Sequence, residues 1–354
     1  MLRAPRSNIF LFKIKTNKRN ASACSCICTP THFLFLKPPT MQYKHLLPAL
    51  ILTLAFTACS DDDKLPHIDD RQQTSTENKN QNPATVSEWQ RLEVPRVKNN
   101  AENIVLVRKV PSYGVNYILE YDRKKRSQRW ACFQWYDGNS GTAWNRSNWD
   151  YETSNPWAML NLRTHGWGDP FQPDPDLPLE ERTELEEYDG IPYQRGHIVA
   201  SADRVNSKEA NEQTFYLSNI MPQYKNLNEG IWQDMESQLR TWNSKKNKPY
   251  RETLYVCKGG TIDGNNINTT TATGLIVPKY FFMAVLAKVS NNNYKALAFW
   301  VAHTSTNEKG KPLKNYVKSI DELEQLTGID FFCNLPDDIE DEVEKSYTLA
   351  DWGL

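Results

Sequence analysis

The sequence is poor in the residues that build most metal and nucleotide sites. Its 354 residues include seven cysteines and six histidines, and no two cysteines stand in a Cys-x-x-Cys pair. No glycine-rich segment has both the spacing and the lysine of a phosphate-binding loop. These absences exclude a zinc ribbon and a P-loop nucleotide hydrolase.

Few cysteines remain for cross-linking after residue 59. Beyond Cys59 only Cys132, Cys257 and Cys333 occur. An exported chain could form one disulfide from these three, and the sequence leaves open which pair would form it.

The chain also lacks an apolar run of the length that a membrane span needs. The run from Leu46 to Phe56 follows Lys44 and has the length and flanks of a secretory signal that begins at Met41. Residues 1–40 are basic and contain no acidic residue. We therefore expect residues 1–40 to be a non-native upstream extension and residues 41–58 to be a signal peptide.

The end of this signal resembles that of a bacterial lipoprotein, in which a cysteine is lipidated and becomes the first mature residue. Thr57, Ala58 and Cys59 fit that pattern, and residues 60–63 (SDDD) resemble the acidic stretch that favours surface display in some Gram-negative lipoproteins. The resemblance implies an exported outer-membrane lipoprotein, surface-exposed or periplasmic, that touches the membrane only through the lipid on Cys59. The alternative is an ordinary cleaved signal with an incidental cysteine.

Removal of the first 58 residues leaves an acidic protein. They hold eight Lys and Arg and no Asp or Glu, so the remainder has 34 basic against 43 acidic residues, a net charge of −9. Such a chain is not a general polyanion binder, and contact with nucleic acid would need a locally basic site. Residues 59–100 are polar with few large apolar side chains, so we expect a disordered tether there.

Residues 101–354 have the composition of one globular domain. Segments with strand-like content are 102–110, 115–122, 129–137, 214–220, 252–260, 279–289 and 294–304. They are interrupted by helices without regular βαβ alternation, which indicates an α+β domain. Residues 150–192 contain six prolines and predict a long loop, with a short helix allowed at 178–188.

Two helices are predicted from apolar spacing and capping residues. Within residues 226–243 the apolar side chains recur every three or four positions, and Asn226 or Asn228 could cap the helix. Near the end of the chain, Ser319 and Glu322 form a capping-box pattern and Gly328 provides a helix stop.

Three histidines fall in the expected domain, and one of them has unusual neighbours. His303 ends an apolar strand and is expected to pack there, while His165 is expected to be exposed in the proline-rich loop. His197 follows Arg195 and Gly196 in the segment 193–204 (YQRGHIVASADR). An Arg-Gly-His tripeptide alone is a weak signal, so the rest of the chain decides its meaning.

The deciding feature is a run of amides that leads into the first predicted helix. Asn228, Trp232, Glu236 and Arg240 are spaced by four residues, which places them on adjacent turns of one helix. Taken singly, these residues are ordinary cap, core and surface positions. Together with the Arg-Gly-His segment, the pattern resembles the DNA/RNA non-specific endonuclease family, whose hallmark is D-R-G-H followed by S-N-x-x-P-Q and N-x-G-x-W-x-x-x-E. The matching positions of the second part are Ser218, Asn219, Pro222, Gln223, Asn228, Gly230, Trp232 and Glu236.

This resemblance covers about residues 101–335 and implies a fold and a chemistry. The fold would be a central antiparallel sheet flanked by helices, with a ββα-metal (His-Me finger) motif at the active site. The activity would be hydrolysis of DNA and RNA through phosphate contacts, dependent on Mg²⁺ or on Mn²⁺ or another divalent cation. Whether the protein forms a homodimer stays open.

The resemblance also implies a role for each matching residue. His197 would be the general base, Asn228 the single direct metal ligand, and Glu236 the residue that holds metal-bound water. Arg146 would stabilise the charge on phosphorus, with Arg163 and Arg182 as rivals because the register of the long loop is ambiguous. Three further residues would shape the site: Arg195, Asn219 and Arg240.

The chemistry of these residue types suits phosphodiester hydrolysis. A histidine with a pKa near 6.5 can accept a proton at neutral pH, and Mg²⁺ needs few protein ligands because it keeps most of its water. A fixed arginine can donate charge-assisted hydrogen bonds where negative charge develops.

The sequence departs from the family hallmark at one position. Gln194 stands where the hallmark has aspartate, and an amide can still orient a neighbour by hydrogen bonding. The rival interpretation is therefore a catalytically weakened lipoprotein of the same fold that binds nucleic acid or a surface partner. A zinc hydrolase is a third alternative, but the domain lacks clustered His and Cys ligands.

Overall fold

The computed structural model describes residues 77–244, 251–290 and 293–354. The expected upstream extension, the signal peptide, Cys59 and residues 60–76 lie outside the described residues. Among the helices that the structure does describe, none combines the length and the apolar character that crossing a membrane would take.

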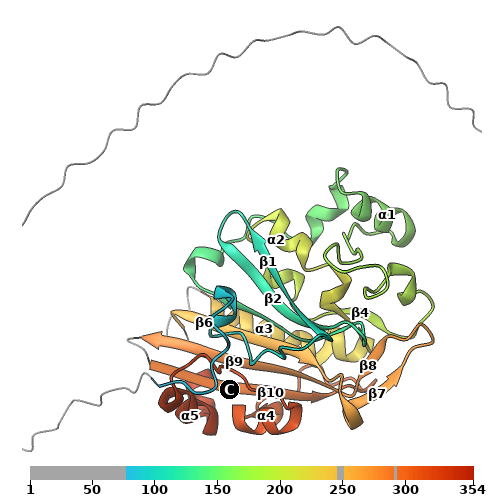
Figure 1. The fold of residues 1–354 in the computed structure, drawn as a ribbon. Coiled ribbons are helices and arrows are strands. Elements are labelled where there is room, and N and C mark those ends of the chain that lie inside the picture. Colours follow the sequence, from blue (N-terminus) through green and yellow to red (C-terminus); the bar gives the residue numbers. More distant parts are fainter. Residues whose placement is uncertain (1–76, 245–250, 291–292) are drawn as a thin grey trace, which may run out of the picture. The chain divides into compact units, whose positions relative to one another are not determined.

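A seven-stranded antiparallel sheet forms the centre of the domain (Figure 1). Its strand order is β1-β2-β3-β6-β9-β10-β11, so the strands of the N-terminal meander lie beside strands from the C-terminal half. The strands are β1 Asn103–Val110, β2 Gly114–Asp122, β3 Ser127–Trp135, β6 Thr253–Gly260, β9 Tyr280–Ser290, β10 Asn293–Ala302 and β11 Val317–Lys318. Six of the segments expected to be strands are confirmed in this sheet.

Both faces of the sheet are buried, because side chains alternate between two cores along each strand. In β6, Leu254 and Val256 belong to one core, whereas Cys257 belongs to the other. Apolar residues on both faces explain why the central strands are almost continuously hydrophobic rather than alternating with polar residues.

The first face is covered by helix α3 (Trp232–Asn243). The predicted apolar stripe is confirmed, since Ile231, Met235, Leu239 and Trp242 are all buried. The Trp242 ring lies parallel to that of Phe299 in β10, with centroids 6.1 Å apart. This packing fixes the helix against the sheet and therefore fixes the direction of its opposite, polar side.

The second face is covered by helices α4 (Ile320–Thr327) and α5 (Asp337–Lys345), drawn in red in Figure 1. The capping box of α4 is confirmed, with Glu322 N donating to Ser319 Oγ at 3.1 Å and Ser319 N donating to Glu322 at 3.0 Å. Gly328 ends the helix at φ 66°, a left-handed conformation that glycine adopts without steric cost. Helix α5 and the terminal turn α6 (Leu349–Trp352) were not predicted.

Smaller elements lie outside the main sheet. They are the strand pairs β4 (Gln194–His197) with β5 (Ile220–Gln223) and β7 (Ile267–Thr270) with β8 (Ile276–Pro278), and the helices α1 (Pro156–His165) and α2 (Lys208–Gln213). The expectation of a strand over 214–220 is wrong, because a 3₁₀ turn at Leu217–Asn219 precedes β5.

The proline-rich stretch 150–192 is more structured than expected. It contains α1, which begins with Asn155 as its cap and Pro156 in the first turn, two signals of a helix start. The helix allowed at 178–188 is reduced to a 3₁₀ turn at Leu185–Tyr188. His165 is exposed as expected but ends α1 rather than lying in a loop.

The expected tether ends earlier than residue 100. Residues 77–100 pack against the C-terminal part of the domain, and Asp337 N donates to Glu77 O at 2.9 Å. Asn82 is 1 % exposed, and its side chain hydrogen-bonds to backbone groups of Trp89, Pro95 and Val97 at 3.0 to 3.1 Å. Polar side chains thus help to order this segment by pairing with backbone groups, and Val94 and Val97 are buried in the core of the second sheet face.

The described cysteines are free thiols. Cys132 in β3 lies opposite Cys257 in β6 in the antiparallel register, and both side chains are buried. Cys333 is buried as well.

We predict that Asn82→Ala lowers the free energy of unfolding by about 2 to 3 kcal/mol, because the substitution leaves buried backbone donors and acceptors unpaired. Urea denaturation would measure the change. Asn99→Ala, at an exposed position of the same segment, should change it by less than about 0.5 kcal/mol. Equal effects of the two substitutions would contradict the packed arrangement of residues 77–100.

Candidate active site

Two short strands and a helix form the frame of the site. Strands β4 and β5 pair antiparallel, with Gln194 opposite Gln223 and His197 opposite Ile220, and the chain then enters α3 through a π-helical turn at Leu227–Ile231. This is the ββα arrangement that the resemblance implied. Gly196 is required there because a Cβ atom on it would lie 2.2 Å from Cδ of Gln223.

Asn219 fixes the backbone that follows His197. Its side chain is fully buried, and Oδ1 accepts a hydrogen bond from Val199 N at 2.9 Å. Its Nδ2 donates to Val199 O at 2.9 Å and to Thr214 O at 2.7 Å. Because its amide atoms are occupied by backbone groups, Asn219 positions the histidine strand and does not line the cleft described next.

A cleft of about 1100 Å³ opens along the frame. It is lined by residues from the two parts of the sequence pattern and from the proline-rich stretch. Six of the seven predicted site residues lie on its wall: Arg146, Arg195, His197, Asn228, Glu236 and Arg240. Residues far apart in the sequence are therefore brought to one cavity.

The imidazole of His197 lies between aromatic rings. Its centroid is 5.3 Å from that of Phe171 and 5.0 Å from that of Phe215. Burial, with smaller contributions from Arg146 and Lys258, holds its pKa well below 6.5. Nε2 is buried without a hydrogen-bond partner in the described part of the chain. The ring is thus kept neutral more firmly than an ordinary histidine would be.

Two arginines carry positive charge into the cleft beside this ring. Arg146 Nη2 lies 2.5 Å from Oδ2 of the buried Asp169, which anchors a half-exposed guanidinium. Arg195 has its guanidinium 4.2 Å from the ring centroid of Phe171, and burial lowers its pKa. Arg146, the arginine expected to stabilise the phosphate, lines the cleft, whereas its rivals Arg163 and Arg182 do not.

A chain of amide hydrogen bonds holds Asn228. Its Nδ2 donates to Gln194 Oε1 at 2.9 Å, and Gln194 Nε2 in turn donates to Glu229 Oε1 at 2.6 Å. This arrangement leaves Oδ1 of Asn228 as the acceptor at the cleft. Gln194 therefore performs an orienting role that a carboxylate could perform only in part, because a carboxylate accepts hydrogen bonds but cannot donate to Glu229.

A group of four charges, in which Lys258 and Asp203 are fully buried, lies under the helix side of the cleft. Lys258 Nζ is 2.7 Å from Glu236 Oε1 and 3.9 Å from Asp203 Oδ2, and its side chain is fully buried. Asp203 also accepts from Arg240 Nη1 at 2.8 Å. Burial raises the pKa of Glu236, and Lys258 opposes that rise. Two carboxylates and two cations thus compensate one another, and Glu236 is held at the cleft wall.

Sequence reasoning missed Lys258, Asp169 and the role of Asp203. A signal existed for Lys258, since it continues the buried series of Leu254 and Val256 on one face of β6, where a charged residue needs a partner. Asp169 gave no comparable signal, because it lies in the proline-rich stretch and meets Arg146 only in the folded chain.

We predict that Lys258→Met destabilises the protein by about 3 to 5 kcal/mol, because it leaves two buried carboxylates without their shared cation. Thermal denaturation would show the loss. Lys314→Met, at an exposed position, serves as the control and should leave the melting temperature within about 2 °C. A near-neutral Lys258→Met would show that the carboxylates do not depend on this ammonium.

Comparison with known proteins identifies relatives among nucleases. Residues 97–338 match the model of the family described as DNA/RNA non-specific endonuclease. Nuclease C1 of Cunninghamella echinulata var. echinulata is 30% identical over 169 residues, covering 47% of this chain and 67% of the relative. A nuclease of Nostoc sp. is 28% identical over 238 residues, covering 65% and 75%. Human mitochondrial endonuclease G is 27% identical over 233 residues, covering 62% and 68%.

A solved structure supports the same fold. The crystal structure of the EndoG/EndoGI complex contains a chain that superposes with a TM-score of 0.51 at 19% identity, covering 65% of this chain and 86% of that chain. The family match spans most of the described domain, including the ββα frame and the cleft. The chain belongs to the DNA/RNA non-specific endonuclease family and is a nucleic-acid hydrolase.

Proposed function

We propose that the protein is a Mg²⁺-dependent endonuclease in which His197 is the general base and Asn228 is the only direct protein ligand of the metal. The observation that carries the proposal is the meeting of His197, Arg146, Asn228 and Glu236 on one cleft wall. DNA and RNA would both be substrates, because the positive groups of the cleft suit phosphate and no contact with base or sugar is needed.

The environment of His197 suits proton abstraction from water. A base must be unprotonated to act, and burial together with the flanking cations keeps this imidazole neutral. Of its two ring nitrogens, Nε2 is enclosed, so we assign the proton transfer to Nδ1. Phe171 and Phe215 would limit rotation of the ring and keep this nitrogen directed at the cleft.

The arginines would stabilise the negative charge that builds up on the phosphate. Arg146 is held by Asp169, and the ring of Phe171 supports Arg195, so neither guanidinium needs to be reorganised when the charge develops. Arg195 makes no ion pair within the described residues, which leaves its donors for phosphate oxygens.

The polar atoms around Asn228 fit a hard divalent cation. Asn228 Oδ1 and the carboxylate of Glu236 are oxygen donors, which Mg²⁺ prefers to nitrogen and sulfur. In this arrangement Asn228 would bind directly and Glu236 would hold water of the cation. The bound cation would supply Lewis acidity toward the phosphate and a proton source for the leaving oxygen.

We further propose that the enzyme is displayed as an outer-membrane lipoprotein through Cys59. The signal-like residues 41–58 and the acidic residues 60–63 support this placement. A surface nuclease could degrade nucleic acid outside the cell. Labelling with radioactive palmitate would test the anchor, and it should be lost in Cys59→Ala.

We expect purified protein to cut both supercoiled plasmid and RNA in Mg²⁺ and neither in EDTA. His197→Ala should reduce the rate at least about 100-fold, the usual lower bound for loss of a general base. Gln325→Ala, an exposed substitution on α4, is the control. Binding without cleavage by the parent protein would favour the alternative of a catalytically weakened nucleic-acid-binding protein.

The pH dependence of the reaction should reflect the neutral histidine. A lowered pKa means that His197 is protonated only below its ordinary value of 6.5. The acid limb of the kcat/KM profile should therefore fall below pH 6.5, and activity should be nearly constant from pH 6.5 to 7.5. An acid limb above pH 7 would contradict the assignment of this histidine as the base.

Gln194 should act through Asn228. Gln194→Ala is expected to weaken Mg²⁺ affinity about 10-fold to 100-fold, as loss of a partner that orients a metal ligand usually does. Titration of activity with Mg²⁺ would measure the change, with kcat at saturating metal falling less than the affinity. Gln194→Asp should restore part of the affinity, because aspartate can accept from Asn228 but cannot bond to Glu229 as the amide does.

A further inference from the structure

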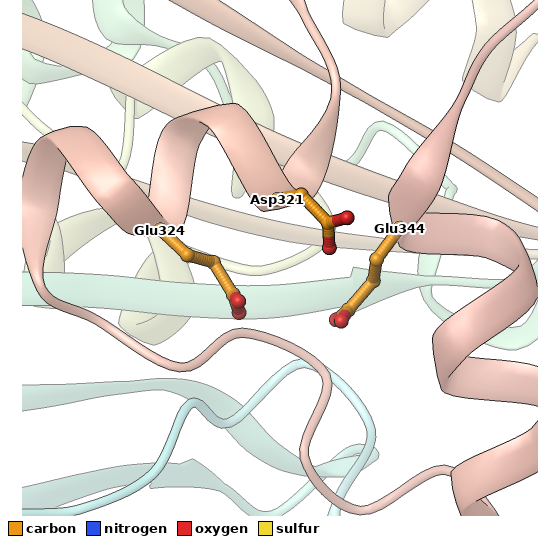
Figure 2. A group of neighbouring side chains, drawn as sticks. All are labelled: Asp321, Glu324 and Glu344. Atoms are coloured by element: carbon orange, nitrogen blue, oxygen red, sulfur yellow. The ribbon is translucent and has the colours of Figure 1, made fainter.

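Three carboxylates meet between helices α4 and α5, on the sheet face opposite the one that α3 covers. Asp321 and Glu324 project from α4 and Glu344 projects from α5, and Figure 2 shows the three side chains converging on the space between the helices. One carboxylate oxygen from each lies within 4.8 Å of the other two. The group is separate from the cleft, whose lining includes none of these residues.

The carboxylate of Glu344 is buried without a partner among the described residues that would compensate its burial. The residue is 6 % exposed, and its Oε1 has no hydrogen-bond partner in the described part of the chain. A buried carboxylate oxygen without a partner is costly, and proteins normally pair such a group or use it to bind a cation. Figure 2 shows its carboxylate directed toward the side chains of Asp321 and Glu324.

Further acidic groups surround the three carboxylates without a matching number of cations. Glu340 is 5 % exposed and accepts a hydrogen bond from Asn80 Nδ2 at 2.8 Å, and the same amide lies 3.3 Å from both oxygens of Asp330. Among the described residues, none of these carboxylates forms an ion pair within 4.0 Å. The Oδ1 atom of Asn80 is also buried without a partner.

Burial and mutual repulsion disfavour the charged forms of these groups. Burial, followed by the neighbouring carboxylates of Glu324 and Glu340, raises the pKa of Glu344 to about 10. Burial likewise raises the pKa of Glu324 to about 7 and that of Glu340 to about 8. A bound cation would stabilise the charged carboxylates in their buried position and would also offset the repulsion between them.

We propose that Asp321, Glu324 and Glu344 form a Ca²⁺ site that links α4 to α5. Ca²⁺ accepts six to eight oxygen ligands in flexible geometry, so carboxylates from two helices can be completed by water. Mg²⁺ demands a regular octahedron and keeps its water more strongly, which a group assembled from two separate helices is less suited to provide. Glu340 lies one helical turn before Glu344 and accepts a hydrogen bond from Asn80. Through this bond, ion binding would also restrict the movement of residues 77–82.

The site would stabilise the domain rather than take part in catalysis. Ca²⁺ that binds only the folded chain raises stability with concentration, and at 100 times the dissociation constant the melting temperature should rise by about 5 to 10 °C. The ion would join α4 and α5 directly. The N-terminal segment would be connected to the site through the hydrogen bond between Asn80 and Glu340 on α5.

The test uses the full chain stripped with EDTA and titrated with CaCl₂ in excess MgCl₂, so that Mg²⁺ occupies the active site. The melting temperature of the parent should rise with Ca²⁺, and equilibrium dialysis with ⁴⁵Ca²⁺ should count one ion per chain. Glu344→Gln should abolish both responses while raising the melting temperature of the Ca²⁺-free protein, because the buried amide is neutral without the proton that Glu344, with its raised pKa, must bind on folding. A folding defect would lower the melting temperature of the Ca²⁺-free variant, so a higher melting temperature together with a lost Ca²⁺ response indicates the loss of a ligand.

Glu342→Gln, an exposed position two residues away on the same helix, is the matched control and should respond to Ca²⁺ as the parent does. Asp321→Asn should weaken binding at least 10-fold. The proposal is overturned if the parent shows no Ca²⁺-dependent shift, which would mean that the carboxyl groups are simply protonated, or if Glu344→Gln binds Ca²⁺ as tightly as the parent. Nuclease activity in Mg²⁺ is measured separately, so failure of this proposal leaves the proposed function untouched.

Discussion

The placement of the active site depends on one buried ammonium group. Lys258 stands on the central strand β6 and pairs with Glu236 on α3, while Asp203, which follows the histidine strand, lies within 3.9 Å. The sheet, the helix and the turn after β4 are thereby tied to a single point below the cleft. Because a buried charge is costly without partners, each of these elements is constrained by the others.

The residues to which we assign catalytic roles divide into two groups, one held by helix α3 and one held by the proline-rich stretch. Glu236 and Arg240 project from a helix whose apolar side is packed on the sheet. Arg146 and His197 instead depend on the proline-rich stretch, which supplies Asp169 and Phe171. A long irregular segment is tolerated here because its buried polar groups are paired, and this pairing gives the cleft a rigid wall.

The sequence predicted the parts of the structure that leave a local pattern in the chain. The strands were readable from their runs of apolar residues, the stripe of α3 from its regular apolar spacing, and the cap of α4 from the pair Ser319 and Glu322. The motif residues were readable because their spacing is specific. The partners of Asp169 and Lys258 were not readable, since they are 22 to 55 residues away, and helix α1 was not, since it lies in a segment with little periodicity. The packed segment 77–100 was mistaken for a tether because its composition is mostly polar, although Trp89, Leu92, Val94 and Val97 pack in the core on the α4 and α5 side and Asn82 pairs with backbone groups.

The packing of the N-terminal segment determines on which face of the sheet the chain enters the domain. Glu77 meets the start of α5, which covers the sheet face opposite α3 and the cleft. A force applied to the chain at this point would therefore act on the sheet face that α4 and α5 cover, and not on the side of the cleft.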